Sequence, residues 1–351
     1  MAIFYVLLFA SALIFSLQFL VTRQYQRING TGFLGAVRLS FMAYLTIAIF
    51  FFVKGCITFG GLNFGFSWFT LLMTLGISIV SLSCVYMGIK VLSFGDMSVY
   101  SVFMMLGSLI LPSLVGLVFY GEELTLLKAI AILLMFSAII FSVSSIDKSK
   151  INLKAILFYI GIFVMNGMIG VFMTIHQNQP ELTAAAIKVG ETFEINNDVF
   201  MTWYGLSTVM LTAVIYAVVT IYQKIKKIKA PLFEESVISA YDKTPNTDAT
   251  ETESVAQTTK SNKGKIVLKL LLLSALFAAG YGVCNGLGDY FIALSTQPGA
   301  LGSSVTFPII NGGTILFSSL FGVFLYKEKM TVYTVISLVL VIASTVLFMF
   351  V

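Results

Sequence analysis

The spacing of the apolar residues constrains the fold of this chain more than any other feature. They gather in blocks of about 20, the length a helix needs to cross the roughly 30 Å hydrocarbon core of a bilayer. In lipid every backbone N–H and C=O must be paired within its segment, which favours helices. The sequence therefore predicts an all-α integral membrane protein of ten transmembrane helices, at about residues 2–22, 33–53, 66–89, 98–119, 126–145, 153–175, 200–222, 266–288, 300–325 and 331–351.

Composition agrees with a lipid environment. Of the 351 residues, 58% are hydrophobic and 11% are charged, whereas a soluble domain keeps about a quarter of its residues charged. The first block is not expected to be a cleaved signal peptide, because it has no positive start and no small-residue cleavage pattern before Arg23. The net charge of +5 follows from the distribution of Lys and Arg, so we expect no nucleic-acid partner.

The Lys and Arg residues predict how the chain sits in the membrane. All but four of the 21 lie in or beside the connections after the first, third, fifth, seventh and ninth helices. Such residues mark the cytoplasmic ends of helices, so both termini are predicted to lie outside the cytoplasm, in a plasma (inner) membrane. The connection at about 223–265 is rich in Thr, Ser, Asn and Lys and is predicted to be disordered. Its lysines are a solvated flank or, alternatively, a contact with anionic lipid.

Two stretches of the sequence repeat each other, FYGEELTLLKAI at 119–130 and LYKEKMTVYTVI at 325–336. This indicates five helices followed by five, with one repeat at 1–152 and the other at 153–351. An odd number of crossings inserts the second half upside down, which is a common construction of secondary transporters. The identical aligned pairs are Gly116/Gly322, Tyr120/Tyr326, Glu122/Glu328, Thr125/Thr331, Ile130/Ile336 and Leu134/Leu340.

Each repeated stretch forms a turn that opens a helix at a membrane surface, and its polar residues are Glu122 and Thr125, then Glu328 and Thr331. A carboxylate there would meet unpaired N–H groups and the positive end of the helix dipole. We predict that the two glutamates cap the fifth and tenth helices. The alternative is a direct role in substrate binding or gating.

These residues also carry a resemblance. LPSLVGLVFYGEELTLLKAIAILLMFSAIIF and GAVRLSFMAYL resemble an EamA-type repeat of the drug/metabolite transporter superfamily. The second turn, KEKMT, departs from that pattern, and Ala131, Ala138, Ser337 and Ser344 stand where the family often has Gly. All four are small, so close helix packing is still expected. The resemblance implies a central cavity between the halves. It also includes members drawn with cytoplasmic termini, with which the charge distribution disagrees.

Polar side chains inside spanning helices are costly and usually face a bundle interior or a cavity. We expect some of them to bind substrate and others to bond between helices, with Gln18, Asn285 and Asn311 sharing one central space. Arg38 has three alternatives: reaching the interface, a structural pair, or an anionic substrate group. The candidate substrate-binding residues are Gln18, Arg38, Tyr86, Tyr100, Asn166, Tyr281, Asn285, Thr306 and Asn311.

Helix breakers and missing residue types narrow the function further. Pro112 and Pro308 interrupt corresponding helices of the two halves, which favours a binding site near them. Asp96 and Asp289 are predicted at helix ends, so a proton pump built on a buried carboxylate is not expected. His176 is the single histidine, so we expect no metal site. The glycines of GYGVCNGLGD at 280–289 are expected to allow a close helix contact rather than nucleotide binding.

The sequence thus predicts a secondary transporter that moves a small organic solute by alternating access. A metabolite, an amino acid or a drug-like compound would fit, and the family resemblance favours export. The expected partners are this solute and membrane lipid, with the chain a monomer or a homodimer and no cofactor. No catalytic constellation is visible, so an enzyme is not expected. The alternative is a channel or a membrane-embedded protein without a transport function.

Overall fold

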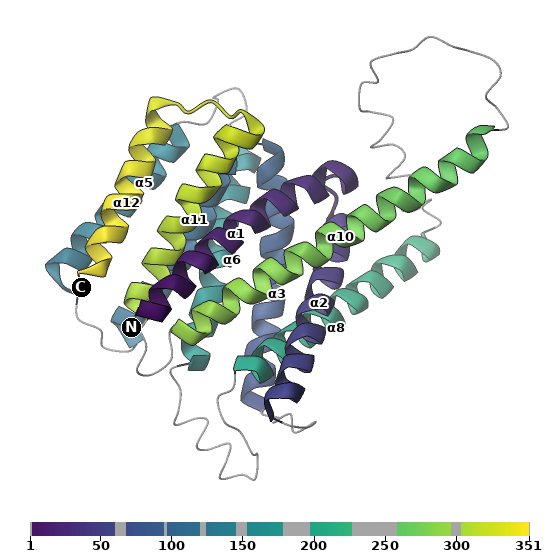
Figure 1. Ribbon diagram of the computed structural model, residues 1–351, viewed down its shortest axis with the longest axis horizontal. Helices are drawn as coiled ribbons and strands as arrows, with labels where there is room; N and C mark the ends of the chain where they lie inside the picture. The colour runs from purple at the N-terminus through teal and green to yellow at the C-terminus, as the bar shows by residue number, and fades with distance from the viewer. Residues whose placement is uncertain are drawn as a thin grey trace.

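The computed structural model describes residues 2–59, 68–94, 97–119, 124–144, 153–177, 197–226, 258–295 and 303–350. Within these ranges the chain forms ten helices, which confirms the predicted all-α fold (Figure 1). They are α1 (Ala2–Asn29), α2 (Phe33–Phe59), α3 (Trp68–Phe94), α4 (Met97–Phe119), α5 (Leu126–Ser144), α6 (Leu153–Gln177), α8 (Asn197–Ile225), α10 (Thr258–Ser295), α11 (Ser303–Tyr326) and α12 (Val332–Met349).

Several helices continue past their apolar blocks. An apolar block indicates only the part of a helix that suits lipid, and a helix can extend from there into the polar interface. The largest difference is α10, whose 38 residues begin at Thr258. The prediction of a disordered connection at 223–265 is therefore wrong at both ends, where α8 and α10 are helical. Its centre, 227–257, lies outside the described residues.

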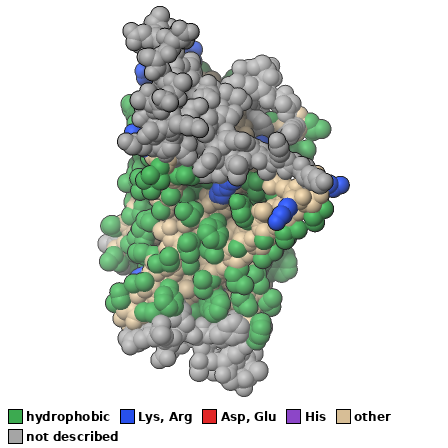
Figure 2. Space-filling view, turned by 90° about the vertical axis from the view of Figure 1, so that its right-hand side faces the viewer, with side chains coloured by type: hydrophobic (Ala, Val, Ile, Leu, Met, Phe, Trp, Pro, Cys, Tyr) green, Lys and Arg blue, Asp and Glu red, His purple; other side chains and the backbone are tan. Residues whose placement is uncertain are grey.

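The exterior of the bundle is apolar. Seven of the described helices, α1, α2, α3, α6, α8, α10 and α11, are long and apolar enough to cross a membrane. The described apolar stretches of α4, α5 and α12 are shorter. Figure 2 shows one face covered by hydrophobic side chains that few Lys or Arg side chains interrupt. A surface this apolar is compatible with a multi-pass membrane protein.

Helices far apart in the sequence pack side by side. The α2 helix packs against α8, α4 against α6, and α1 against both α10 and α11. The α3 helix packs against α6 and α8, and α10 also contacts α2. The α5 and α12 helices form a pair at one side of the bundle and meet the rest mainly through α4 and α11 (Figure 1).

Small residues let particular helices approach closely, as predicted. A Cβ atom added to Gly282 of α10 would lie 2.3 Å from the carbonyl oxygen of Ala43 on α2. In the pair of α5 and α12, Ser337 Oγ donates to the Ala138 carbonyl (2.9 Å) and Ser344 Oγ to the Ala131 carbonyl (2.7 Å). The contact between α5 and α12 is therefore made by the four small residues Ala131, Ala138, Ser337 and Ser344.

Candidate binding cavity

A small cavity lies among eight helices, α1, α2, α3, α4, α6, α8, α10 and α11. The space open to the centres of water molecules measures about 50 Å³, enough for a few waters. Its amide and carboxyl side chains are Asn166, Asn285, Asp289 and Asn311. Each of the four is less than a tenth exposed. The cavity is therefore a polar interior inside an apolar bundle.

One wall is a chain of hydrogen bonds along α10. Gln18 Nε2 of α1 donates to Asn285 Oδ1 (3.1 Å), and Asn285 Nδ2 donates to Asp289 Oδ2 (2.9 Å). The spacing of four residues places Asn285 and Asp289 on one face of the helix. The expectation that Asp289 ends its helix is wrong, because α10 continues to Ser295 and buries this side chain. A carboxylate does lie deep within a spanning helix.

The opposite wall comes from α4, α6 and α11. Ser108 Oγ donates to Asn311 Oδ1 (3.1 Å), whereas Asn311 Nδ2 has no partner among the described residues. Asn166 Nδ2 donates to the Met104 carbonyl (2.7 Å). Asn311 lies one turn after Pro308, near the interruption that the sequence associated with a binding site.

Tyrosines close the side of the cavity between α2, α3 and α8. The hydroxyls of Tyr44 and Tyr204 lie 2.8 Å apart, and Tyr204 is also bonded to Ser81. The sequence analysis missed these three residues. The signal was present for Tyr44, because a hydroxyl in the middle of a spanning helix cannot reach the interface and needs a partner inside the bundle.

The structure brings together only part of the predicted site. Asn166, Tyr281, Asn285 and Asn311 line the cavity, and Gln18 lies directly behind Asn285. The remaining four predicted residues lie elsewhere, so the prediction that places them at a central site is not supported by their positions. They are Arg38, Tyr86, Tyr100 and Thr306.

Each of those four has a different surrounding. Arg38 lines a separate apolar groove of about 520 Å³ between α1, α2, α8 and α10. Tyr86 packs edge-on against Phe33 (ring centroids 5.4 Å apart) at an outer groove. Tyr100 is buried in the core, and Thr306 Oγ1 donates to the carbonyl of Ser295 (3.2 Å).

Towards one end of the bundle Arg23 of α1 forms an ion pair with Glu328. We call these two residues, together with Tyr326 and Met97, the Glu328 closure. Glu328 Oε1 also accepts from the amide of Met97, the first residue of α4 (3.0 Å). The Arg23 guanidinium lies over the Tyr326 ring, 4.0 Å from its centroid. This closure joins α1, α4 and the turn after α11.

The prediction that Glu328 caps the last helix is wrong. Thr331 is the N-cap of α12 and accepts from the Thr334 amide (3.1 Å). Lys327 adopts a left-handed backbone with φ of 54°, and the Glu328 amide donates back to Gly322 (3.1 Å), so the carboxylate turns towards Arg23. In the similar stretch at 119–130, Thr125 accepts from the Lys128 amide (3.3 Å), and Glu122 lies outside the described residues.

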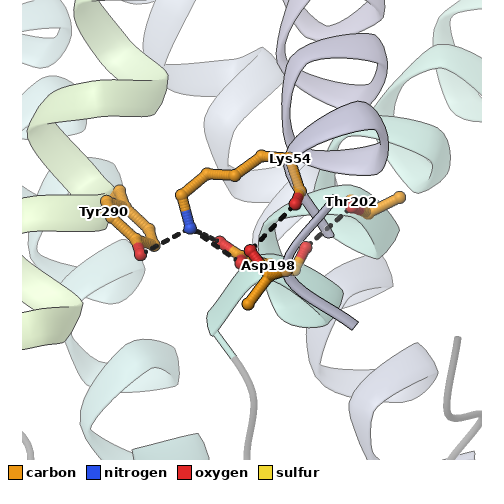
Figure 3. A network of polar contacts seen from close by, with 5 residues as sticks. Lys54, Asp198, Thr202 and Tyr290 are labelled. Carbon is orange, nitrogen blue, oxygen red and sulfur yellow. Dashed lines mark hydrogen bonds and ion pairs between the residues drawn. The ribbon is translucent and has the colours of Figure 1, made fainter. Parts of the chain in front are cut away.

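The other end carries a second polar network, the Lys54 closure, formed by Lys54, Asp198 and Tyr290 (Figure 3). Lys54 Nζ of α2 lies 2.7 Å from both carboxylate oxygens of Asp198 in the first turn of α8. It also donates to the Tyr290 hydroxyl of α10 (2.8 Å). The sequence did not predict this network, because the partners of Lys54 lie 144 and 236 residues away.

The two closures lie towards opposite ends of the bundle. Consecutive helices α1 and α2 run in opposite directions, since only residues 30–32 separate them. Arg23 is near the end of α1, and Lys54 is near the end of α2. One ion pair therefore lies towards each end of the bundle, and no group of three metal-ligating side chains occurs among the described residues.

Comparison with known proteins adds information on the fold alone. No family model matches the chain, and no curated protein matches it. A solved structure described as "Crystal structure of protein" resembles it over 96% of this chain and 96% of its own, with a TM-score of 0.52 and 11% sequence identity. The TM-score indicates a similar overall fold and, at this low identity, nothing more. The resemblance to EamA-type transporters stays a prediction.

Proposed function

We propose that this chain is a secondary transporter of the plasma membrane that moves a small organic solute by alternating access. The observation that carries the proposal is the buried polar cavity, lined by eight helices, in a bundle that has one ion pair towards each end. Polar groups are costly inside a membrane-embedded bundle and mark sites and pathways there.

The size of the cavity supports alternating access over a permanent pore. A site for a small organic molecule measures about 300–1,000 Å³, well above the present space of about 50 Å³. Admitting a solute therefore requires one end to open. In this proposal both ion pairs hold the bundle closed, and opening one of them gives the inward-facing form and opening the other the outward-facing form.

The packing of the helices supports the inverted repeat at 1–152 and 153–351. If each helix of the first half corresponds to one of the second, in the order α1 to α6 through α5 to α12, the contacts fall into matching pairs. The contact of α1 with α11 matches that of α6 with α4, and that of α1 with α10 matches that of α6 with α3. Repeats of this kind rock against each other around a central site.

The charge distribution orients the two ends. The end of α8, with Lys224 in its last turn, lies at the same end of the bundle as the junction of α1 and α2 (Figure 1). By the positive-inside rule this end is cytoplasmic. The Glu328 closure is then the inner one and the Lys54 closure the outer one, with both termini outside. Export remains the direction favoured by the family resemblance.

A two-sided labelling experiment tests the proposal without knowledge of the substrate. The cavity-lining Ser108 is replaced by Cys after Cys56, Cys84 and Cys284 have been replaced by Ala. A membrane-impermeant maleimide is then applied to right-side-out or to inside-out vesicles. Each closure is weakened separately, by Glu328→Gln or by Asp198→Asn. Losing an ion pair of about 1.4 kcal/mol should raise labelling about 10-fold, from the cytoplasmic side in Glu328→Gln and from the outer side in Asp198→Asn.

The controls separate a carrier from the alternatives. A Cys at Ser93, an exposed position at the end of the α3 span, should react from the cytoplasmic side equally in all backgrounds. Arg23→Gln and Lys54→Gln remove the other partner of each pair and should repeat the effect of Glu328→Gln and Asp198→Asn. Labelling from both sides in one variant would indicate a channel. Labelling that neither variant changes would indicate a protein without alternating access.

A further inference from the structure

The Asp289 carboxylate is a buried acid in the cavity, and no Lys, Arg or His among the described residues forms an ion pair with it. Its side chain is 7% exposed, and Asn285 donates to one of its oxygens. The ion pairs among the described residues are Arg23 with Glu328 and Lys54 with Asp198, and neither includes this carboxylate. The second oxygen of Asp289 accepts no hydrogen bond from any described residue.

An isolated carboxylate in such a place needs a positive partner. Removing an ionised carboxylate from water without a counter-charge costs several kcal/mol, so the group either binds a cation or takes up a proton. The amide of Asn285 does not supply that charge. Its oxygen is held by Gln18 and its N–H by Asp289, so Asn285 fixes the direction of the carboxylate.

The other walls suit the body of a small organic cation. Tyrosine rings attract cations through their negative faces, and the flexible side chains of methionines adapt to ligands of different shape. Among the described residues no Lys, Arg or His lines the cavity. The aromatic and methionine side chains that line it are Phe15, Tyr44, Met104, Met105, Met173, Tyr204, Tyr281 and Phe307.

The titratable side chains that share the cavity leave Asp289 as the site of charge. The side chains that line the cavity from α1, α4, α6 and α11 are not titratable. Apart from Asp289, the titratable side chains that line it from α2, α3, α8 and α10 are neutral when protonated. They are Tyr44, Cys84, Tyr204 and Tyr281. A proton or a cation that enters the cavity is therefore drawn to one carboxylate.

We propose that Asp289 binds the ammonium group of a small organic cation and carries a proton when the cavity is empty of that cation. This inference rests on the proposed transport function and narrows its substrate class. The Nδ2 of Asn311, a residue 4% exposed, has no partner among the described residues and donates to an acceptor on the substrate's body. When the cation leaves, the carboxylate accepts one proton from water. When the cation returns, that proton passes back to water.

The experiment uses the full chain purified into nanodiscs in weakly buffered solution. Three permanently charged cations are titrated: tetramethylammonium, benzyltrimethylammonium and tetraphenylphosphonium. Their charge does not depend on pH, so a proton released on binding comes from the protein. We expect at least one cation to raise the unfolding temperature by mass action and to release protons as it binds. The neutral benzyl alcohol should do neither.

Variants of Asp289 assign the effect to this carboxylate. Asp289→Asn keeps the shape of the side chain, should weaken cation binding about 100-fold and should abolish proton release. Asp289→Glu restores the charge and should restore proton release. The proposal is overturned if none of the three cations stabilises the parent protein, or if Asp289→Asn binds as tightly as the parent. The two-sided labelling of Ser108→Cys would be unaffected by either result, so the transport proposal would stand separately.

Discussion

Glu328 and Thr331 illustrate what a sequence can and cannot say about single side chains. A Thr immediately before an apolar block is a strong N-cap signal, and both Thr125 and Thr331 accept from amides of the helix that follows. The direction of the Glu328 side chain could not be predicted. It depends on the left-handed backbone of Lys327 and on Arg23, which is 305 residues away.

At this scale the caps can be tested by removing one oxygen. Thr331→Val keeps the shape of the side chain but loses the acceptor for the Thr334 amide, so it should lower the stability by about 1 kcal/mol. Thr46→Val is the matched control, because this exposed hydroxyl only donates to a carbonyl of its own helix. The measurement is the apparent unfolding temperature in detergent. Equal shifts for the two variants would contradict the capping role.

The cavity itself was predicted in part. Amides in the middle of apolar blocks, at 166, 285 and 311, are expensive wherever they lie, so the sequence identified them without knowing their neighbours. Asp289 was placed at a helix end because the apolar block appeared to stop at 288. Helix α10 continues because Tyr290, Phe291 and Ile292 again suit a helix in an apolar bundle.

At the scale of helices, the contact of α10 with α2 depends on Gly282. In Gly282→Ala the new Cβ would lie 2.3 Å from the Ala43 carbonyl oxygen, so the two backbones must separate. We expect a loss of about 1–3 kcal/mol in stability. Gly280→Ala is the control, since its Cβ would meet only Val21 at 3.9 Å and Ala favours a helix by up to about 1 kcal/mol.

Apparent unfolding temperatures of the two glycine variants give the comparison. A lower temperature for Gly282→Ala and an unchanged or higher one for Gly280→Ala is the expected result. If both variants unfold at the parental temperature, the close approach of α2 and α10 is not a determinant of stability.

For the whole molecule, the sequence predicted an all-α fold because lipid leaves the backbone few alternatives. It did not predict which helices are neighbours. Contacts such as that of α1 with α10 join segments more than 200 residues apart. Because all the helices are apolar, their sequences do not show which helix packs against which. Direction in the membrane follows from Lys and Arg positions instead.

Orientation is therefore tested on the intact chain. A reporter that is active only outside the cytoplasm, fused after Val351, should be active, and one that works only in the cytoplasm should be silent. The same reporters inserted in the connection at 227–257 should give the reverse pattern. An active cytoplasmic reporter after Val351 would invert the assignment of the inner and outer closures.

Helix α10 links occupancy of the cavity to the state of one end, because Asp289 and Tyr290 are consecutive residues. Asp289 lines the cavity, while Tyr290 accepts from Lys54 at the Lys54 closure. A rigid helix cannot turn or shift at one of these positions without moving the other. Thermodynamic linkage then requires reciprocity: if opening the Lys54 closure changes affinity at Asp289 by some factor, filling the site at Asp289 changes the opening equilibrium by the same factor.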